Sequence, residues 1–270
     1  MGATSFALRI FRWVGWFRVK CTILGSGTSM GVPVAGGFYK EELLNDARNF
    51  RNRCSAWLQE GEHSIVIDAG PEFRLQSISA GIKHIDALLV THEHMDHVSG
   101  IDDLRMYNYI QKKPIPVYTT KGAISSISSR FDYLFGAKKY PGSTDLELHE
   151  LQNTLYIGPF KITPIPAKHG SLDIFGFRIN DLCYLTDVKE LPDSSLKIMK
   201  GSKVVILSAL RWQPEHPTHL SIPDAVELIN DLNIPEGYLI HMNGQVRHAE
   251  SNARLPKHIK LAFDHQTIYL

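Results

Sequence analysis

One stretch of this sequence carries a density of metal-binding side chains that no structural role requires: Thr91-His92-Glu93-His94-Met95-Asp96-His97. Imidazole nitrogen and carboxylate oxygen are ligand types that suit Zn²⁺, Fe and Mn²⁺. Side chains alternate along an extended segment, so His92 and His94 are expected on the same side, with Asp96 and His97 turning inward beyond the bend. We interpret the stretch as a metal site.

The flanking sequence places this stretch at a corner between a strand and a helix. The apolar run Ile85–Val90 precedes it and has the length of a strand that is covered on both faces. Residues 98–110 follow it, with apolar side chains that indicate a helix. Ligands and catalytic groups of α/β folds gather at the carboxyl ends of strands, so this position supports a functional site.

Composition favours one enzyme-sized unit. The 270 residues are 43% hydrophobic, which is compatible with one large domain or two small ones, and one is the simpler reading. We predict a single domain over residues 19–270 and an amino-terminal arm over residues 1–18. The formal net charge is +1, so no global field attracts nucleic acid or a membrane surface.

The cysteines and the first residues indicate a cytoplasmic protein. Cys21, Cys54 and Cys183 are far apart and odd in number, which favours buried thiols in a reducing compartment over a disulfide framework. Residues 6–17 are apolar enough to suggest a secretory leader, but Arg9 and Arg12 interrupt them and no small-residue cleavage site follows. We expect an amphipathic or frayed arm, and no segment reaches the length of a transmembrane span.

Strand-like runs dominate the rest of the chain. Strands are predicted at residues 19–24, 54–58, 64–68, 85–91, 115–119, 154–157, 160–165, 174–179, 182–186, 204–207, 237–241 and 260–263, and helices near residues 72–80, 101–110, 123–135 and 222–232. Two sheets packed face to face with helices outside satisfy this order better than one singly wound parallel sheet. The expected fold class is α+β.

Three more ligand-type side chains fall at the ends of predicted strands. With the first cluster they supply seven ligands for two metals: His92, His94 and His169 for one, Asp96, His97 and His241 for the other, and Asp187 as the bridge. Paired metals of this kind are typical of hydrolases that activate a water molecule.

With these ligands in this order, the sequence resembles the metallo-β-lactamase superfamily, whose mark is H-x-H-x-D-H followed by a later His, a later Asp and a final His. The resemblance spans nearly all of residues 19–270 and implies an αββα sandwich of the metallo-β-lactamase type. Residues 24–33 (LGSGTSMGVP), 67–74 (IDAGPEFR) and 216–221 (HPTHLS) further resemble the subgroup that contains phosphoribosyl cyclic phosphodiesterase. That subgroup hydrolyses phosphodiesters rather than lactams.

The resemblance also implies roles for individual residues. The seven ligands would hold two divalent metal ions, Zn or Mn, and Asp96 would belong to the catalytic centre as well. His219, which precedes His241 in the chain, resembles the catalytic histidine near the scissile group. Asp68 resembles a carboxylate that supports the ligand loop by orienting an imidazole, although a turn cap accounts for it equally well.

Two departures from the family pattern matter. Relatives often hold a structural zinc with a Cys-x-Cys-x-x-Cys segment after Gly-Val-Pro and a His three residues beyond the final ligand. Residues 34–40 (VAGGFYK) contain no cysteine and Gly244 stands at the His position, so we expect no structural zinc. Ser208 stands where many relatives carry an acidic residue, which leaves the contacts around His219 open.

The expected activity is hydrolysis of a small cyclic or nucleotide-like phosphodiester by a cytoplasmic, dinuclear metal-dependent phosphodiesterase. His219 is expected to assist at a phosphoryl oxygen or to protonate the leaving oxygen. A tRNA 3′-processing nuclease is one alternative, but the net charge of +1 and the lack of a basic arm disfavour a nucleic acid partner. A metal-binding scaffold without catalysis is another. No membrane partner is expected, and a homodimer is compatible with this reading.

Overall fold

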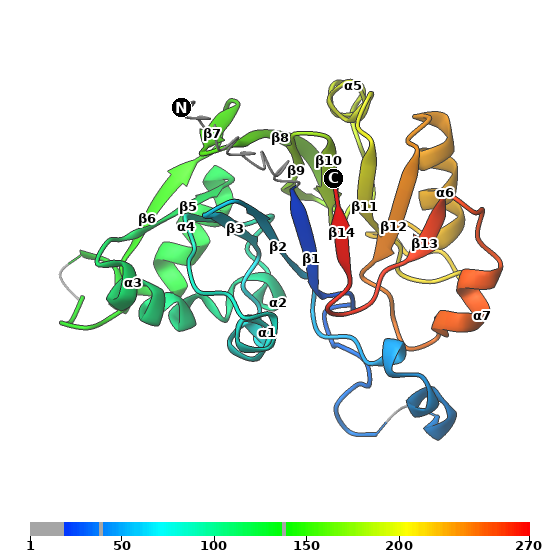
Figure 1. The fold of residues 1–270 in the computed structure, drawn as a ribbon, viewed down its shortest axis with the longest axis horizontal. Helices are drawn as coiled ribbons and strands as arrows, with labels where there is room; N and C mark the ends of the chain where they lie inside the picture. The colour runs from blue at the N-terminus through cyan, green and yellow to red at the C-terminus, as the bar shows by residue number, and fades with distance from the viewer. Residues whose placement is uncertain (1–18, 38–39, 137–138) are drawn as a thin grey trace, which may run out of the picture.

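Two seven-stranded sheets form the centre of the computed structural model, which describes residues 19–37, 40–136 and 139–270 (Figure 1). The strand order is β14-β1-β2-β3-β4-β5-β6 in the first sheet and β13-β12-β11-β10-β9-β8-β7 in the second. The arm predicted over residues 1–18 lies outside the described residues.

The first sheet comes mainly from the amino-terminal half of the chain. Its strands are β1 (Lys20–Gly25), β2 (Ser55–Glu60), β3 (His63–Ile67), β4 (Ala87–Leu89), β5 (Ile115–Thr119), β6 (Leu146–Glu150) and β14 (Thr267–Tyr269). Four α-helices accompany it: α1 (Phe73–Ala80), α2 (Met95–Val98), α3 (Arg105–Gln111) and α4 (Lys121–Arg130). Short 3₁₀ helices are η1 (Glu41–Asn45), η2 (Ala47–Asn49), η3 (Ile101–Leu104) and η4 (Asp132–Leu134).

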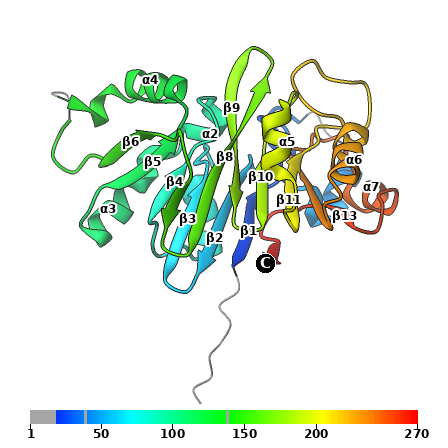
Figure 2. The same cartoon turned by 90° about the horizontal axis from the view of Figure 1, so that it is seen from above.

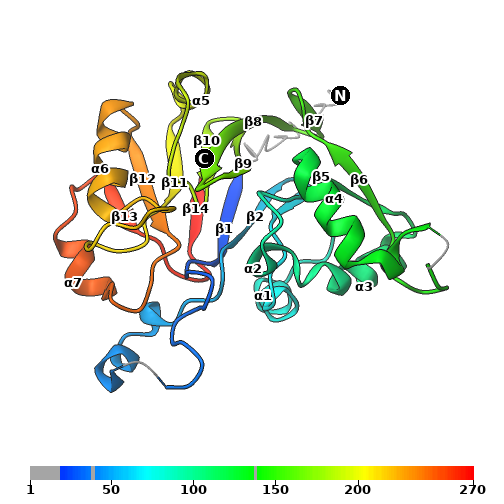
Figure 3. The same cartoon turned by 180° about the vertical axis from the view of Figure 1, so that it is seen from behind.

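The second sheet comes from the carboxyl-terminal half. Its strands are β7 (Leu155–Ile157), β8 (Phe160–His169), β9 (Leu172–Ile179), β10 (Leu182–Leu185), β11 (Val204–Ser208), β12 (Glu236–Ile240) and β13 (Ile259–Leu261), and its helices are α5 (Asp193–Met199), α6 (Ile222–Asp231) and α7 (His248–Ala253). The helices of the two halves lie on opposite sides of the paired sheets (Figures 2 and 3).

Alternate residues of the strands fill different layers. In β11, Val204 and Ile206 pack between the two sheets, whereas Val205 and Leu207 pack beneath the helices of the second half. The same period of two separates the layers of the first sheet, as expected for strands that are buried on both faces. The predicted α+β fold, an αββα sandwich, is confirmed.

The topology brings the ends of several strands to one edge of the molecule. β10, β11 and β12 are parallel, and β8 has the same direction because β9 is antiparallel to both β8 and β10. β3 and β4 are parallel in the first sheet. The loops after these strands therefore hold the side chains of the candidate site. Within the described residues, no helix is long and apolar enough to cross a bilayer.

Candidate metal centre

The predicted ligands come together where the strand ends of both sheets meet. They are His92 and His94 after β4, Asp96 and His97 in α2, His169 at the end of β8, Asp187 after β10 and His241 after β12. Each of the seven belongs to at least one group of three whose ligand atoms lie within 4.8 Å of one another. One sheet thus supplies four of the side chains and the other supplies three.

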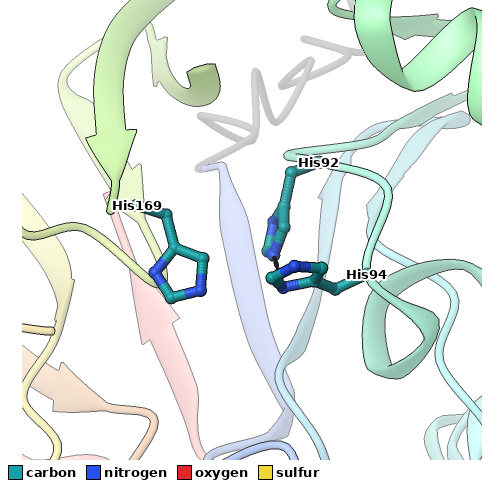
Figure 4. Close-up of side chains that lie close together, drawn as sticks. All are labelled: His92, His94 and His169. Atoms are coloured by element: carbon teal, nitrogen blue, oxygen red, sulfur yellow. Dashed lines mark hydrogen bonds between the residues drawn. The ribbon is translucent and has the colours of Figure 1, made fainter. Parts of the chain in front are cut away.

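Three imidazoles form the first group (Figure 4). His92 Nε2 and His94 Nδ1 are 3.0 Å apart, and the ring centroid of His169 lies 5.6 Å and 5.1 Å from those of His92 and His94. His169 Nδ1 donates a hydrogen bond to the Thr218 carbonyl at 2.9 Å, since a carbonyl can only accept. The other nitrogen of His169 is therefore unprotonated in the neutral ring and free to bind a cation.

The second group is built around Asp187. His97 Nε2 lies 3.1 Å from both Asp96 Oδ2 and Asp187 Oδ2, and His241 Nε2 lies 3.0 Å from Asp187 Oδ1. The two carboxylate oxygens of Asp187 thus face different histidines. Thr186 donates its hydroxyl hydrogen to Asp187 Oδ2 at 2.8 Å, which orients the carboxylate.

The donor set fits divalent cations. His97 Nε2 and both ring nitrogens of His241 are buried and form no hydrogen bond in the described part of the chain, despite their short contacts with carboxylate oxygens. A buried polar atom without a partner costs about 1–3 kcal/mol, so such atoms rarely accumulate without a ligand. Imidazole nitrogens that converge with carboxylates are the ligand set that Zn²⁺ and Mn²⁺ accept.

The carboxylates of the cluster favour their charged form. Burial raises the pKa of Asp187, but His241 and His97 outweigh it and hold this pKa well below its ordinary value. Burial acts the same way on Asp96, and the His97 ring beside it brings the Asp96 pKa down to about 2. Burial lowers the pKa of His92 well below its ordinary value, which keeps that ring neutral and able to donate a lone pair.

Asp68 lies behind the ligands and is fully buried. Its Oδ2 accepts a hydrogen bond from His97 Nδ1 at 2.7 Å, and Thr91 donates its backbone N–H to Oδ1 at 2.8 Å and its hydroxyl to Oδ2 at 2.9 Å. Burial raises the pKa of Asp68, while His97 and Thr91 act in the opposite direction. These contacts match a carboxylate that orients an imidazole rather than a cap of its own turn.

Three site residues at strand ends have left-handed backbone conformations, which the sequence did not reveal. The φ angles are 59° for Asp68, 56° for Asp187 and 61° for His241. Such angles are uncommon outside glycine and cost of order 1–3 kcal/mol each, and they cluster at functional sites. The chain turns sharply there, and each of the three side chains contacts the cluster at the edge where the strand ends of both sheets meet.

Close backbone contact also shapes the ligand loop. A Cβ atom added at Gly70 would lie 2.1 Å from the carbonyl oxygen of Asp96, so only glycine allows this approach. The backbone N–H of Ala69 also donates to the His97 carbonyl at 2.8 Å. The segment after β3 thus supports α2 through its backbone.

His219 lies at the edge of the same cluster. Its ring stacks on that of His241 with centroids 4.8 Å apart, and its Nδ1 is 3.5 Å from Asp187 Oδ1. Burial and the neighbouring His241 lower the pKa of His219 to about 3. His219, Asp187 and His169 also form a group with ligand spacing, so geometry alone does not separate a catalytic role from a ligand role.

The side chain of Ser208 forms a hydrogen bond with the backbone next to Asp187. Its hydroxyl accepts a hydrogen bond from the backbone N–H of Val188 at 3.2 Å, next to Asp187. Two threonines that the sequence did not predict, Thr91 and Thr186, orient site carboxylates with their hydroxyls. Each directly precedes a ligand at the end of a strand, which is the signal that could have identified them.

Comparisons with known proteins agree with this geometry. A sequence model of the beta-lactamase superfamily domain matches residues 63–242. A crystal structure described as a new diphosphatase from the PhnP family superposes with a TM-score of 0.86 and 32% identity, covering 94% of this chain and 98% of that chain.

Two curated relatives match only part of their own length. A Porphyromonas gingivalis protein named octanoyltransferase is 34% identical over 250 residues, which are 91% of this chain and 50% of that protein. A ribonuclease Z from a Bradyrhizobium species is 28% identical over 131 residues, 47% of this chain and 44% of that protein. The chain spans about half the length of these relatives or less. On the family match and the fold, the chain belongs to the metallo-β-lactamase superfamily.

Proposed function

We propose that this protein hydrolyses a small cyclic or nucleotide-like phosphodiester with two divalent metal ions, Zn or Mn, held by the seven-residue cluster. The observation that carries the proposal is the convergence of these ligands from both sheets, with His219 beside them. The similarity to a diphosphatase of the PhnP family supports it, because phosphodiester and diphosphate hydrolysis both displace an oxygen at phosphorus.

Different residues of the cluster would have different roles in such a reaction. Bound metal ions would supply a nucleophile at neutral pH and stabilise charge that develops on phosphoryl oxygens. Asp187 would hold the two halves of the cluster together, because its oxygens face His97 and His241. Asp68 keeps His97 oriented through its Nδ1. The neutral ring that the low pKa of His219 favours would donate a hydrogen bond to a phosphoryl oxygen. Protonation of the leaving oxygen by His219 would require the negative charge of a bound phosphate to raise this pKa.

A diphosphate linkage is the second candidate, favoured by the 32% identity to the diphosphatase over 94% of this chain. Acyl transfer has less support, although one relative is named octanoyltransferase, because that protein is about twice as long as the part that matches. The thiols of Cys21, Cys54 and Cys183 are buried, and burial raises the pKa of each, so none is a ready acyl acceptor.

The test is a substrate panel assayed with Zn²⁺ and with Mn²⁺. It contains bis-p-nitrophenyl phosphate, a cyclic ribose phosphate, a nucleoside diphosphate and a precursor tRNA. We expect turnover of the diesters and two metal ions per chain by elemental analysis.

Exclusive cleavage of the diphosphate would favour the second candidate, and exclusive cleavage of the tRNA would favour a nuclease. A protein that holds both metals and cleaves none of the four would be a metal-binding scaffold. A stoichiometry near one, or near three with a thiolate signature, would contradict the dinuclear assignment.

A further inference from the structure

The loop that presents His219 is anchored differently on its two sides. On the downstream side, Leu220 donates its backbone N–H to the Val188 carbonyl at 3.0 Å, and Ser221 begins α6 with a reciprocal capping box. On the upstream side, the backbone N–H and the hydroxyl of Thr218 lie 3.3 Å and 3.2 Å from His216 Nδ1. A backbone N–H can only donate, so His216 Nδ1 is the acceptor.

Thr218 connects this loop to the predicted ligands. Its carbonyl accepts the Nδ1–H of His169 at 2.9 Å, and its methyl group would be 3.0 Å from a Cβ atom placed at Gly170. The next residue in the chain is His219. A shift of Thr218 would therefore release the orientation of His169 and move His219 in the same step.

We infer that His216 is a positioning residue: its Nδ1 accepts the hydrogen bond that holds Thr218, and Thr218 in turn orients His169 and places His219. The His216 ring also lies against that of His219, with centroids 4.8 Å apart at 42°. The acceptor and the ring face are separate features of this side chain. The positioning role belongs to the acceptor, Nδ1.

Three variants separate the two features. His216→Ala removes both the acceptor and the ring, and His216→Phe keeps a ring but has no acceptor. His216→Asn loses the ring and keeps an acceptor in nearly the same place, because asparagine characteristically accepts a hydrogen bond from the backbone N–H two residues further on. Asn is therefore the conservative variant that should restore the function of His216.

Two readouts are needed, and the inference rests on the proposed function for only one of them. The first is kcat on bis-p-nitrophenyl phosphate, which should fall roughly tenfold in the Ala and Phe variants, since misplacement of a catalytic group costs up to two orders of magnitude. The second is Zn²⁺ affinity, measured by competition with a chromophoric chelator. It should weaken severalfold in the same two variants, because partners that orient a ligand histidine contribute 10–100-fold to affinity. The Asn variant should recover most of both.

Two results would overturn the positioning role of His216. Wild-type kcat and Zn²⁺ affinity in His216→Phe would overturn the inference, and so would an Asn variant as impaired as Ala. A pattern in which Phe is active and Asn inactive would assign the role to the ring instead. If the Ala variant does not fold, the Phe and Asn variants still decide. If wild type cleaves no diester, the proposed function fails, and the Zn²⁺ series still tests the role of His216.

Discussion

Asp187 is the residue on which the dinuclear assignment depends most. Its two oxygens lie 3.0 Å from His241 and 3.1 Å from His97, so among the described residues it is the carboxylate that contacts both rings. We expect Asp187→Asn to lower the metal content and to reduce diesterase activity by orders of magnitude, because a neutral amide no longer offsets the repulsion between two cations. Elemental analysis and initial rates measure both effects.

The matched control is Asp173→Asn, which removes the same charge from an exposed position on β9 that pairs with Lys168. This variant should keep wild-type metal content and activity. If Asp187→Asn were equally unaffected, Asp187 would only terminate its strand and the bridge would lie elsewhere.

His219 is expected to behave differently from the ligands. His219→Ala should retain both metals and the fold but lose roughly 10²–10⁴-fold in turnover on a diester with a poor leaving group, the range for a positioned acid. With p-nitrophenolate as the leaving group, the loss should be smaller if His219 protonates the leaving oxygen. An equal loss on both substrates would indicate stabilisation of a phosphoryl oxygen, and loss of metal would make His219 a ligand.

At the scale of elements, the sequence predicted long apolar strands well and short or interrupted elements poorly. β4 covers only Ala87–Leu89, although residues 85–91 were predicted, because the chain leaves the sheet early to form the ligand loop. The helix predicted near residues 101–110 is divided into η3 and α3. The short helices α5 and α7 and the edge strands β6 and β14 were missed, since segments of three to seven residues carry too little periodicity to be recognised.

One contact between elements should give stability a specific pH dependence. Asp264, which precedes β14, accepts hydrogen bonds from the backbone N–H and hydroxyl of Ser26 at 2.9 Å and 2.8 Å, and from the backbone N–H of Asn52 at 2.7 Å. Burial outweighs these bonds and raises the pKa of Asp264 from 3.8 to about 6. The folded protein therefore keeps a proton between these pH values that the unfolded chain has lost.

This difference in pKa determines whether stability rises or falls with pH. The contribution of Asp264 to the free energy of unfolding is fully present below pH 3.8 and is lost as the pH rises through about 6. Its size is up to about 3 kcal/mol, since one pKa unit corresponds to ~1.4 kcal/mol. Asp264→Asn cannot titrate, so the stability of wild type relative to this variant should decrease from pH 4 to pH 7 in urea unfolding experiments. A difference that is constant with pH would contradict the assignment.

For the molecule as a whole, the residue types of the site could be predicted but their surroundings could not. The spacing of histidines and aspartates identified side chains that the fold brings within ligand distance of one another. The left-handed turns at Asp68, Asp187 and His241 were not predictable, because they arise where strands of two sheets end against each other. The hydrogen bond between His169 and Thr218 joins residues 49 positions apart, and only the tertiary structure shows it.

The same geometry makes metal binding a property of the whole fold. Four of the predicted ligands follow β4 in the first sheet and three lie at or just after the ends of strands of the second, so bound ions would connect the two halves across their shared edge. A ligand present at 100 times its dissociation constant stabilises the folded state by about 2.7 kcal/mol for each site. Two such sites would contribute about 5 kcal/mol, which in a chain of this size corresponds to a change of about 10 °C or more in Tm.

Removal of metal with a chelator should therefore lower Tm by about that amount in a single cooperative transition, and Zn²⁺ or Mn²⁺ should restore it. Scanning calorimetry measures both changes. Hydrogen exchange should increase most in the loops after β4, β10 and β12, because the ligands there lose the cations that neutralise their crowded charges and lone pairs. Asp187→Asn should respond much less to the chelator than wild type does, since it has already lost the bridge. If Tm were the same with and without chelator, the folded protein would not hold metal at this edge, and the cluster would have to be stable through its own contacts alone.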